Sequence, residues 1–448
     1  MEELNKDQAG MSETNKPQDP DPRIACEGCS VLLDVNDGDR LVFARLSGGA
    51  VLKIANKNYS LKPLIGAPFG SLFQVESGEE GCFLSRILPV KQENISNNLI
   101  DDSRDNRELV DNNEAQNLTG EEIEAMRREG AKGDEIIEAL IANSKTFDKK
   151  FQLSQEKYKL KKQKKYAPKL LLRRPFARSI CEAYFKKYPA RIGFLRVDAL
   201  SLLLTMANVI AYSDVLVVDM VGGLVTGAAA ERLGGTGYVC NTYKGSSPYS
   251  VEMVRMFNFS ENVIERIVQS SINELSSAKT ASPEENNQQG GVSNAETNIN
   301  ETTSTSDIMV EETSVTTEAS VVDIVAPENK IIKAPKAGAK ASKEAIEMWR
   351  EHGFSSLIMA AQDQDPWSLA KDVLPLLSYS APFAIYHQYL QPLATCMHNL
   401  QQGKMAINLQ ITEPWLREYQ VLPSRSHPHM QMSAFGGYVL SGIRISTT

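Results

Sequence analysis

The sequence of 448 residues contains no apolar run of about eighteen residues, the minimum for a membrane-spanning helix. Its first 22 residues are polar and charged and lack the apolar segment that a signal peptide needs. From these two absences we expect neither a membrane protein nor a secreted one. We expect no membrane partner and a nuclear or cytosolic address.

Cysteine is scarce, and the six residues Cys26, Cys29, Cys82, Cys181, Cys240 and Cys396 follow no framework spacing. This fits a reducing compartment rather than a disulfide scaffold. Cys26 and Cys29 form a lone C-x-x-C, but a structural zinc site needs two further ligands at matched spacing. We therefore expect two solvent-facing cysteines in a disordered leader and no metal.

Basic and aromatic residues are missing from one long stretch. Residues 280–329 contain no Lys or Arg and ten acids, and no aromatic residue occurs between Ser260 and Met348. Such a segment buries too little apolar area to offset the entropy lost on ordering. We predict a disordered, acidic insertion there, and a disordered leader at the polar N-terminus.

Short β-prone runs separated by turn residues fill the region from Ser30 to Pro89. Five or six short strands at this spacing predict a small β-barrel. Two helices are expected next. The first begins at Thr119 with Glu122 as its capping-box partner and ends near Gly130, and the second runs from Asp134 to Asn143.

A strongly basic segment follows, which we call the basic arm. Twelve Lys or Arg residues and only two acids lie between Lys145 and Arg174, with Phe and Tyr residues interleaved. Clustered ammonium groups release counterions from phosphates, and tyrosine rings stack on unpaired bases. RNA binding is the favoured interpretation, although a solvated helical face or a nuclear localisation signal has the same pattern.

Strands and helices alternate on both sides of the insertion. A buried strand at Val215–Val218, a glycine turn, a helix at Leu224–Arg232 and a strand at Tyr238–Asn241 form a parallel βαβ unit, and the pattern resumes after Ser342. The fold class is therefore α/β plus β, with one doubly wound Rossmann-like sheet cut by the insertion.

The glycine turn lacks the partner that a nucleotide site requires. Gly222 and Gly223 follow the first strand, but no carboxylate occurs between Tyr238 and Val251 to receive ribose hydroxyls, and Lys244 stands near the expected acid. A tight turn with close packing explains two glycines equally well, and we favour that interpretation.

These residues resemble a known family, the non-catalytic subunit of the tRNA (adenine-58-N1)-methyltransferase. The matching stretches include Asp105-Asn106-Arg107, Glu156-Lys157-Tyr158, Leu195-Arg196-x-Asp198-x-Leu200 and the run from Trp415 to Gly442. In related adenine N1-methyltransferases an aspartate precedes a loop ending in Pro-Trp. By the spacing before Pro366-Trp367 it would fall near Gln362, an amide that cannot accept a proton as a carboxylate does. Asp363 and Asp365 remain candidate bases, but a helix N-cap and a first-turn charge are favoured.

The resemblance implies a methyltransferase-like domain without catalytic residues or a bound cofactor. S-adenosylmethionine would be held by a homologous catalytic partner, in a heterodimer or a dimer of heterodimers that forms N1-methyladenosine in the T loop of tRNA. The nucleus is the implied location. The expected RNA contacts are Arg104, Asn106, Arg107, Lys145, Lys149, Lys157, Tyr158, Lys161, Lys162, Lys164, Lys165, Arg173, Arg174, Arg425 and His427, although a structural loop explains the last two equally well.

Two other functions stay open at this level: an active methyltransferase that uses Asp363 or Asp365 as its base, and a structural or translation-associated RNA-binding protein without a methyltransferase partner. The predicted organisation is a disordered leader (1–25), a β-barrel domain (26–100), a helical linker with the basic arm (101–190), a Rossmann-like domain in two parts (191–275 and 342–448) and the disordered insertion (276–341).

Overall fold

The computed structural model describes residues 21–54, 57–78, 81–88, 116–148, 150, 152–277, 336–421, 426–433 and 435–446. The leader up to residue 20 and residues 278–335 of the predicted insertion lie outside this set. Within the described ranges, no helix is long and apolar enough to cross a membrane.

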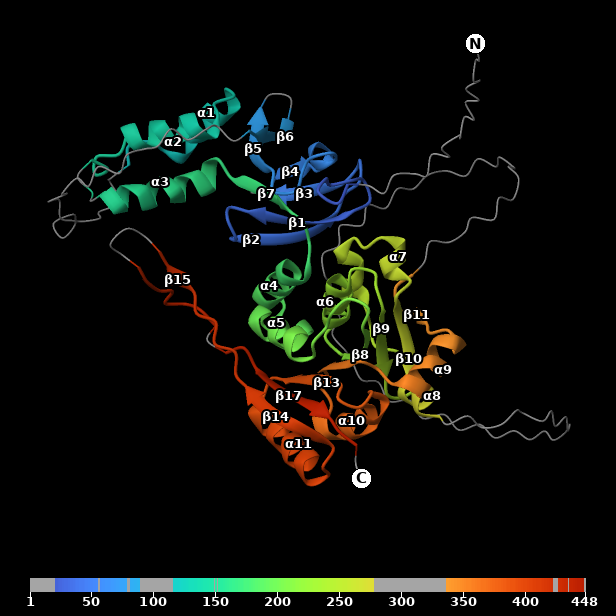
Figure 1. Ribbon diagram of the computed structural model, residues 1–448. Coiled ribbons are helices and arrows are strands. Elements are labelled where there is room, and N and C mark those ends of the chain that lie inside the picture. Colours follow the sequence, from blue (N-terminus) through green and yellow to red (C-terminus); the bar gives the residue numbers. More distant parts are fainter. Residues whose placement is uncertain are drawn as a thin grey trace, which may run out of the picture. The chain divides into compact units, whose positions relative to one another are not determined.

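An antiparallel sheet of five strands forms the N-terminal domain (Figure 1). Its order is β2-β1-β7-β5-β6, and the strands are β1 (Ser30–Val35), β2 (Arg40–Arg45), β5 (Leu72–Gly78), β6 (Gly81–Ile87) and β7 (Lys169–Arg173). The central strand β7 comes from the segment interpreted as the basic arm, and the sequence analysis did not predict it. Leu170 and Leu172 of β7 are fully buried, as the alternation of a half-buried strand requires.

A second hairpin completes the core of this domain. Its strands β3 (Val51–Ile54) and β4 (Lys57–Ser60) pair only with each other among the described strands, but Leu52, Ile54 and Tyr59 share one hydrophobic core with the five-stranded sheet. The expected strands are confirmed. No pairing between the edge strands β2 and β6 closes a barrel in the part of the chain described here.

Three helices lie between β6 and β7 in sequence: α1 (Gly120–Arg128), α2 (Gly133–Ala142) and α3 (Gln152–Tyr166). The predicted capping box is confirmed, since Thr119 Oγ1 accepts from Glu122 N at 3.3 Å and the Glu122 carboxylate accepts from Thr119 N. Ile123, Ile136 and Leu140 form a small cluster that Tyr166 of α3 packs against. This cluster anchors the basic helix α3.

The second sheet has eight strands in the order β11-β10-β9-β8-β12-β13-β17-β14. All pairs are parallel except β13–β17 and β17–β14. The strands are β8 (Asp214–Asp219), β9 (Tyr238–Tyr243), β10 (Ile267–Ser271), β11 (Ala339–Lys340), β12 (Ser356–Ala360), β13 (Pro382–His387), β14 (Ala406–Thr412) and β17 (Tyr438–Arg444). From β8 the chain moves outward to β9 and β10 and then returns to β12 on the other side. This reversal is the switch point of a doubly wound sheet.

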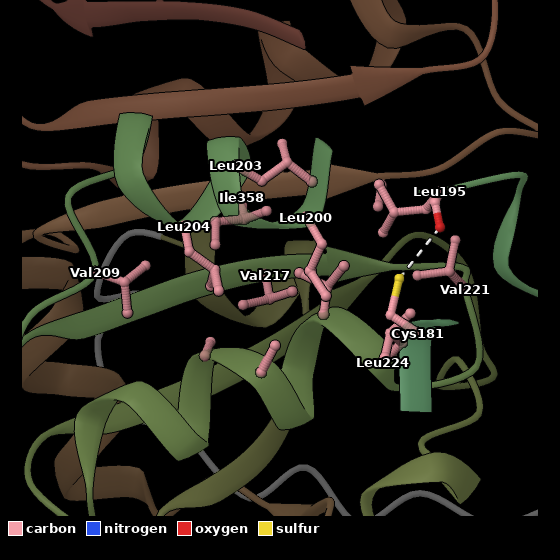
Figure 2. Close-up of a cluster of buried hydrophobic side chains, with 14 of the residues drawn as sticks. Cys181, Leu195, Leu200, Leu203, Leu204, Val209, Val217, Val221, Leu224 and Ile358 are labelled. Atoms are coloured by element: carbon pink, nitrogen blue, oxygen red, sulfur yellow. Dashed lines mark hydrogen bonds between the residues drawn. The ribbon is translucent and has the colours of Figure 1, made fainter. Parts of the chain in front are cut away.

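Helices cover both faces of this sheet. The described ones are α4 (Ala177–Lys187), η2 (Pro189–Ile192), α5 (Val197–Met206), α6 (Leu224–Leu233), η3 (Glu252–Phe257), α7 (Glu261–Ile264), α8 (Ile272–Ser276), α9 (Lys343–His352), α10 (Pro366–Val373), η4 (Leu374–Leu376) and α11 (Leu390–Gln402). Successive residues of β8 enter two different cores: Val215 and Val217 pack with α4, α5 and α6, whereas Leu216 and Val218 pack with the helices α8 to α11. Figure 2 shows leucines of α5 gathered with Val217 and Ile358 in the first of these cores.

The predicted insertion has an ordered end. Ala339 and Lys340 form β11 at the edge of the sheet beside β10, and Lys340 pairs with Glu274 at 2.5 Å. Order therefore resumes before Ser342, where the sequence analysis expected it.

A projection, which we call the hairpin arm, joins β14 to β17. It consists of residues 413–437, described except for 422–425 and 434, and contains the short paired strands β15 (Tyr419–Gln420) and β16 (His427–Pro428). Several large apolar side chains on it are exposed, among them Trp415, Tyr419, Val421 and Met430.

Candidate functional site

The carboxyl end of β8 carries a buried carboxylate, Asp219. In a doubly wound sheet the backbone N–H groups of the turn after this strand normally hold the anionic part of a nucleotide. Here Asp219 accepts from Val221 N at 2.9 Å, Gly223 N at 3.1 Å and Thr226 N at 2.8 Å, and also from Thr226 Oγ1 at 2.9 Å. The protein's own carboxylate thus occupies three backbone donors of the turn.

Burial is complete at Asp219, which has no exposed surface. Burial raises the pKa of this carboxyl group, and the hydrogen bonds from Thr226, Val221 and Gly223 oppose the rise. The neighbouring strand contributes as well, since Asn241 Oδ1 accepts from Asp219 N at 3.3 Å. Asp219 therefore has a structural role: it is fully buried, and its hydrogen bonds stabilise the turn.

Gly222 and Gly223 are required by the chain that packs on them. Both have positive φ, at 75° and 88°, a region that favours glycine. A Cβ on Gly223 would lie 2.6 Å from Val251 Cα, and one on Gly222 would lie 2.9 Å from Met253 Cε. Met253 N also donates to Gly222 O at 3.0 Å. The close packing predicted for these glycines is confirmed.

The covering segment, residues 244–257, is called the strap. It begins at the carboxyl end of β9 and ends in η3, where Met253, Val254 and Phe257 are buried. Two of its side chains reach across to the β12 side of the switch point. Lys244 Nζ pairs with Asp372 Oδ2 at 2.9 Å, and Tyr249 OH accepts from Gln364 Nε2 at 3.2 Å. The strap therefore crosses the switch point, where a doubly wound fold binds its ligand.

At the carboxyl end of β12, the Gln362 side chain is turned toward η2 and toward Gly193, which follows it. Its Nε2 donates to Ala190 O at 3.4 Å, and a Cβ on Gly193 would collide with its side-chain oxygen. Asp365 is the N-cap of α10, because it accepts from Ser368 N at 2.8 Å. Asp363 is exposed and α10 has no acid in its first turn, so the first-turn charge predicted for this pair is wrong.

These residues do not fit S-adenosylmethionine. The turn donors are taken by Asp219, the glycines are covered by Val251 and Met253, and a paired lysine stands where ribose needs an acceptor. At the carboxyl end of β12 the side chain is the amide of Gln362, which is engaged with backbone. No methyl-transfer step can be derived through these groups.

The basic arm is helical over α3, and its lysines divide into two groups. Lys157, Lys161, Lys164 and Lys165 are exposed and recur at helical spacing on one side, and we call them the lysine stripe. Lys159 and Lys162 lie on the other side of α3 over aromatic rings, with Lys162 Nζ 5.1 Å from the Tyr158 ring centroid and 5.9 Å from that of Tyr166. Lys165 of the stripe also lies near a ring, with its Nζ 5.1 Å from the Tyr166 centroid.

The tyrosines of the arm are used within the protein. Tyr158 packs beside Phe147 with ring centroids 5.7 Å apart, and Lys150 and Lys162 lie over its ring. Tyr166 belongs to the cluster that anchors α3. Base stacking by Tyr158 stays a prediction, and its half-buried ring offers less surface for it than the sequence suggested.

Two of the predicted RNA contacts, Lys164 of the stripe and Arg173, already have acidic partners within the protein. Lys164 pairs with Asp39 at 2.8 Å on the surface, and Arg173 lies 3.3 Å from the buried Asp34. Lys145 and Arg174 are exposed, as is His427 in β16. Predicted contacts outside the described residues are Arg104, Asn106, Arg107, Lys149 and Arg425.

The C-x-x-C pair lies in an ordered turn that leads into β1. Ala25 is buried and Cys29 is 8% exposed, so the prediction of two solvent-facing cysteines in a leader is wrong for Cys29. Burial and the neighbouring Cys26 raise the pKa of the Cys29 thiol to about 11. Within the described ranges, no three His, Cys, Asp or Glu side chains gather as a metal site would require.

Fold and site together define a class: an RNA-binding candidate with a doubly wound domain whose nucleotide edge is closed by its own side chains. Residues 24–306 match the Gcd10p family, so the chain belongs to the Gcd10p family. A Dictyostelium discoideum protein is 33% identical over 94% of this chain and 80% of its own length. A Mus musculus protein is 31% identical over 97% of this chain and 92% of its own. Both are named tRNA (adenine(58)-N(1))-methyltransferase non-catalytic subunit.

Two solved structures align with most of this chain at low sequence identity. An S-adenosylmethionine-dependent O-methyltransferase from Thermotoga maritima has a TM-score of 0.47 at 10% identity, covering 95% of this chain and 96% of that one. The tRNA (m1A58) methyltransferase TrmI from Aquifex aeolicus has a TM-score of 0.42 at 12% identity, covering 95% of this chain and all of that one.

Proposed function

We propose that this chain is the non-catalytic, tRNA-binding subunit of a methyltransferase that forms N1-methyladenosine at position 58, in the T loop of tRNA. The main support is the switch point of the sheet, which the protein closes with its own residues. Asp219 binds the backbone donors of the turn, and the strap packs on its glycines, where a methyl donor would otherwise bind. Relatives that align over nearly the whole chain are named for the same role. In this proposal the doubly wound domain is a methyltransferase fold without its chemistry. The N-terminal sheet and the β3–β4 hairpin correspond to an open form of a small barrel, because they share one core although their edges do not pair.

The lysine stripe is the proposed phosphate-binding surface, with Lys145 and Arg174 as further contacts. Exposed ammonium groups at helical spacing follow a phosphate backbone without selecting a base sequence. Because the overall net charge is −8, the local concentration of positive charge on α3 supports this assignment more than the composition does.

The hairpin arm is the proposed docking surface for a homologous catalytic subunit, which would hold S-adenosylmethionine. Trp415, Val421 and Met430 are 75%, 78% and 92% exposed. Burying these apolar side chains under a partner would remove them from water and stabilise the complex. A heterodimer, paired into a dimer of heterodimers, is the proposed assembly. The proposed location is the nucleus, supported only by the lysine run, and imaging of the tagged full chain tests it.

Methyl transfer is expected only when both subunits are present. The test co-purifies the full chain with its catalytic homologue and assays a tRNA transcript with each protein alone and with the complex. A transcript with guanine at position 58 is the control. Methylation by this chain alone would instead establish an active methyltransferase, and RNA binding without any assembly would favour a partner-free RNA-binding protein.

A further inference from the structure

Arg196 is a buried arginine at the start of α5, only 5% exposed. Its guanidinium donates to both carboxylate oxygens of Asp198, with Nε–Oδ1 and Nη2–Oδ2 each 2.7 Å. The fork geometry satisfies two donors and fixes the plane of the guanidinium. A charge this deeply buried is expected to use its remaining donors as well.

Two of the three remaining N–H donors of Arg196 go to the two ends of the hairpin arm. Nη2 donates to Pro414 O at 3.2 Å, where the arm leaves β14, and Nη1 donates to Ser433 O at 2.7 Å, just before it returns to β17. Asp198 Oδ2 accepts from Leu416 N at 3.2 Å. The Arg196–Asp198 ion pair therefore holds both ends of the hairpin arm, although the arm lies more than two hundred residues later in the sequence.

A glycine keeps the guanidinium in place from the returning side. A Cβ on Gly436 would lie 2.7 Å from Arg196 Nη2, so the arm passes against the planar group without room for a side chain. Two of the sequence stretches that carried the family resemblance, Leu195 to Leu200 and Trp415 to Gly442, thus meet at this contact.

The backbone just before Arg196 is itself held at three points. Leu195 O accepts from the Cys181 thiol at 3.3 Å, as drawn in Figure 2. Gly193 O accepts from Tyr386 OH at 2.9 Å, and Ala190 O accepts from Gln362 Nε2. Gln362 is the residue near which a catalytic acid was expected. In this chain Gln362, at the carboxyl end of β12, instead stabilises the segment that leads to Arg196.

We propose that Arg196 and Asp198 form a clasp that positions the hairpin arm, with Gln362 as a supporting residue behind it. The proposal rests on the proposed function in one respect, the assignment of the arm to a catalytic partner. The arm needs such an anchor because its own described strands are two residues each and its large side chains face solvent. Fixing both ends lowers the conformational entropy that the arm loses when it docks.

The experiment measures amide hydrogen exchange in the full chain and then assembly with the catalytic homologue. The variants are Arg196→Lys, which keeps the charge but loses the fork, and Arg196→Met. Arg178→Met is the matched control, because Arg178 forms an exposed pair with Glu182 at 2.7 Å on α4 and does not touch the arm. Exchange near residues 414–416 and 433–436 is expected to rise about tenfold or more in both Arg196 variants, with α5 and β13 unchanged.

Assembly is expected to weaken at least about tenfold in the Arg196 variants and to stay unchanged in the control. Unchanged exchange of the arm in Arg196→Met would overturn the clasp. A freed arm with unchanged assembly would overturn its positioning role and leave the proposed function intact. If the unaltered chain fails to assemble, the proposed function is wrong, while the exchange data still decide the clasp. Asp198→Asn, which retains one acceptor oxygen, is expected to give an intermediate rise, and no rise would argue against the shared role.

Discussion

Replacing Asp219 by alanine is expected to lower the free energy of unfolding by about 3 kcal/mol or more, since each buried donor left without an acceptor costs about 1–3 kcal/mol. Four donors, from Val221, Gly223 and Thr226, would lose their acceptor at once. Removing a desolvated carboxylate offsets part of this loss, so the sum of four single penalties is an upper bound. Urea unfolding of the full chain measures the difference.

The control for this change is Asp39→Ala. Asp39 is 51% exposed and pairs with Lys164 on the surface, so its loss should change stability by no more than about 0.5 kcal/mol. Equal unfolding midpoints for Asp219→Ala and the unaltered chain would mean that the turn does not depend on its internal carboxylate.

The pH dependence at Asp219 has a definite sign. Burial raises its pKa above the ordinary value of 3.8, so the folded chain binds this proton more tightly than the unfolded chain does. The stability that this tighter proton binding adds to the folded chain is fully present below the unfolded-state pKa of 3.8. It is lost as the pH rises through the higher pKa of the folded state. Relative to Asp219→Asn, which cannot titrate, the unaltered chain is expected to lose stability over that range, and a constant difference would contradict the assignment.

Removing the lysine stripe is expected to weaken tRNA binding at least about tenfold near physiological salt. The variant replaces Lys157, Lys161, Lys164 and Lys165 by alanine. If each contacts a phosphate, the slope of log K against log salt should fall by about 3, because each contact contributes about 0.7–0.9. Lys164 must leave Asp39 to contact a phosphate, so its own contribution to the slope is expected to be the smallest of the four. Filter binding over a salt series gives both quantities.

A control with the same change in net charge separates local contact from overall charge. Lys336, Lys343, Lys371 and Lys404 are exposed residues of the doubly wound part of the chain, and replacing them together by alanine should leave the salt slope nearly unchanged. Equal effects of the two quadruple variants would assign the binding to net charge alone and remove α3 from the interface.

Sequence patterns predicted most of the doubly wound sheet because its elements carry their own local signals. The helix predicted to begin at Leu224 begins there as α6, and the strands predicted at Val215–Val218 and Tyr238–Asn241 lie within β8 and β9. Apolar runs bounded by glycine or proline fix such elements without reference to the rest of the chain.

The sequence analysis missed strand β7 because its pairing with distant strands, rather than a local sequence signal, makes it a strand. Lys169–Arg173 is a strand because β1 and β5 each need a partner between them, and those strands are encoded more than ninety residues earlier. The alternation of Leu170 and Leu172 was the available signal, hidden beside the lysine run.

The sequence predicted which functional groups the candidate site lacks, but not which residues fill it. The missing acid after β9 and the amide at Gln362 can be read from the sequence, but the inward turn of Asp219 and the packing of Met253 on Gly222 depend on tertiary contacts. Likewise, Arg196 was noticed as part of a motif, whereas its hydrogen bonds to Pro414 and Ser433 require the folded chain.

The most direct test of the closed switch point is calorimetric titration of the isolated full chain with S-adenosylmethionine, with the catalytic homologue as positive control. We expect no saturable heat from this chain under conditions in which the homologue binds. Saturable binding at one site per chain would contradict the account, most clearly if Gly222→Phe abolished it, because the donor would then occupy the turn that Asp219 and the strap fill.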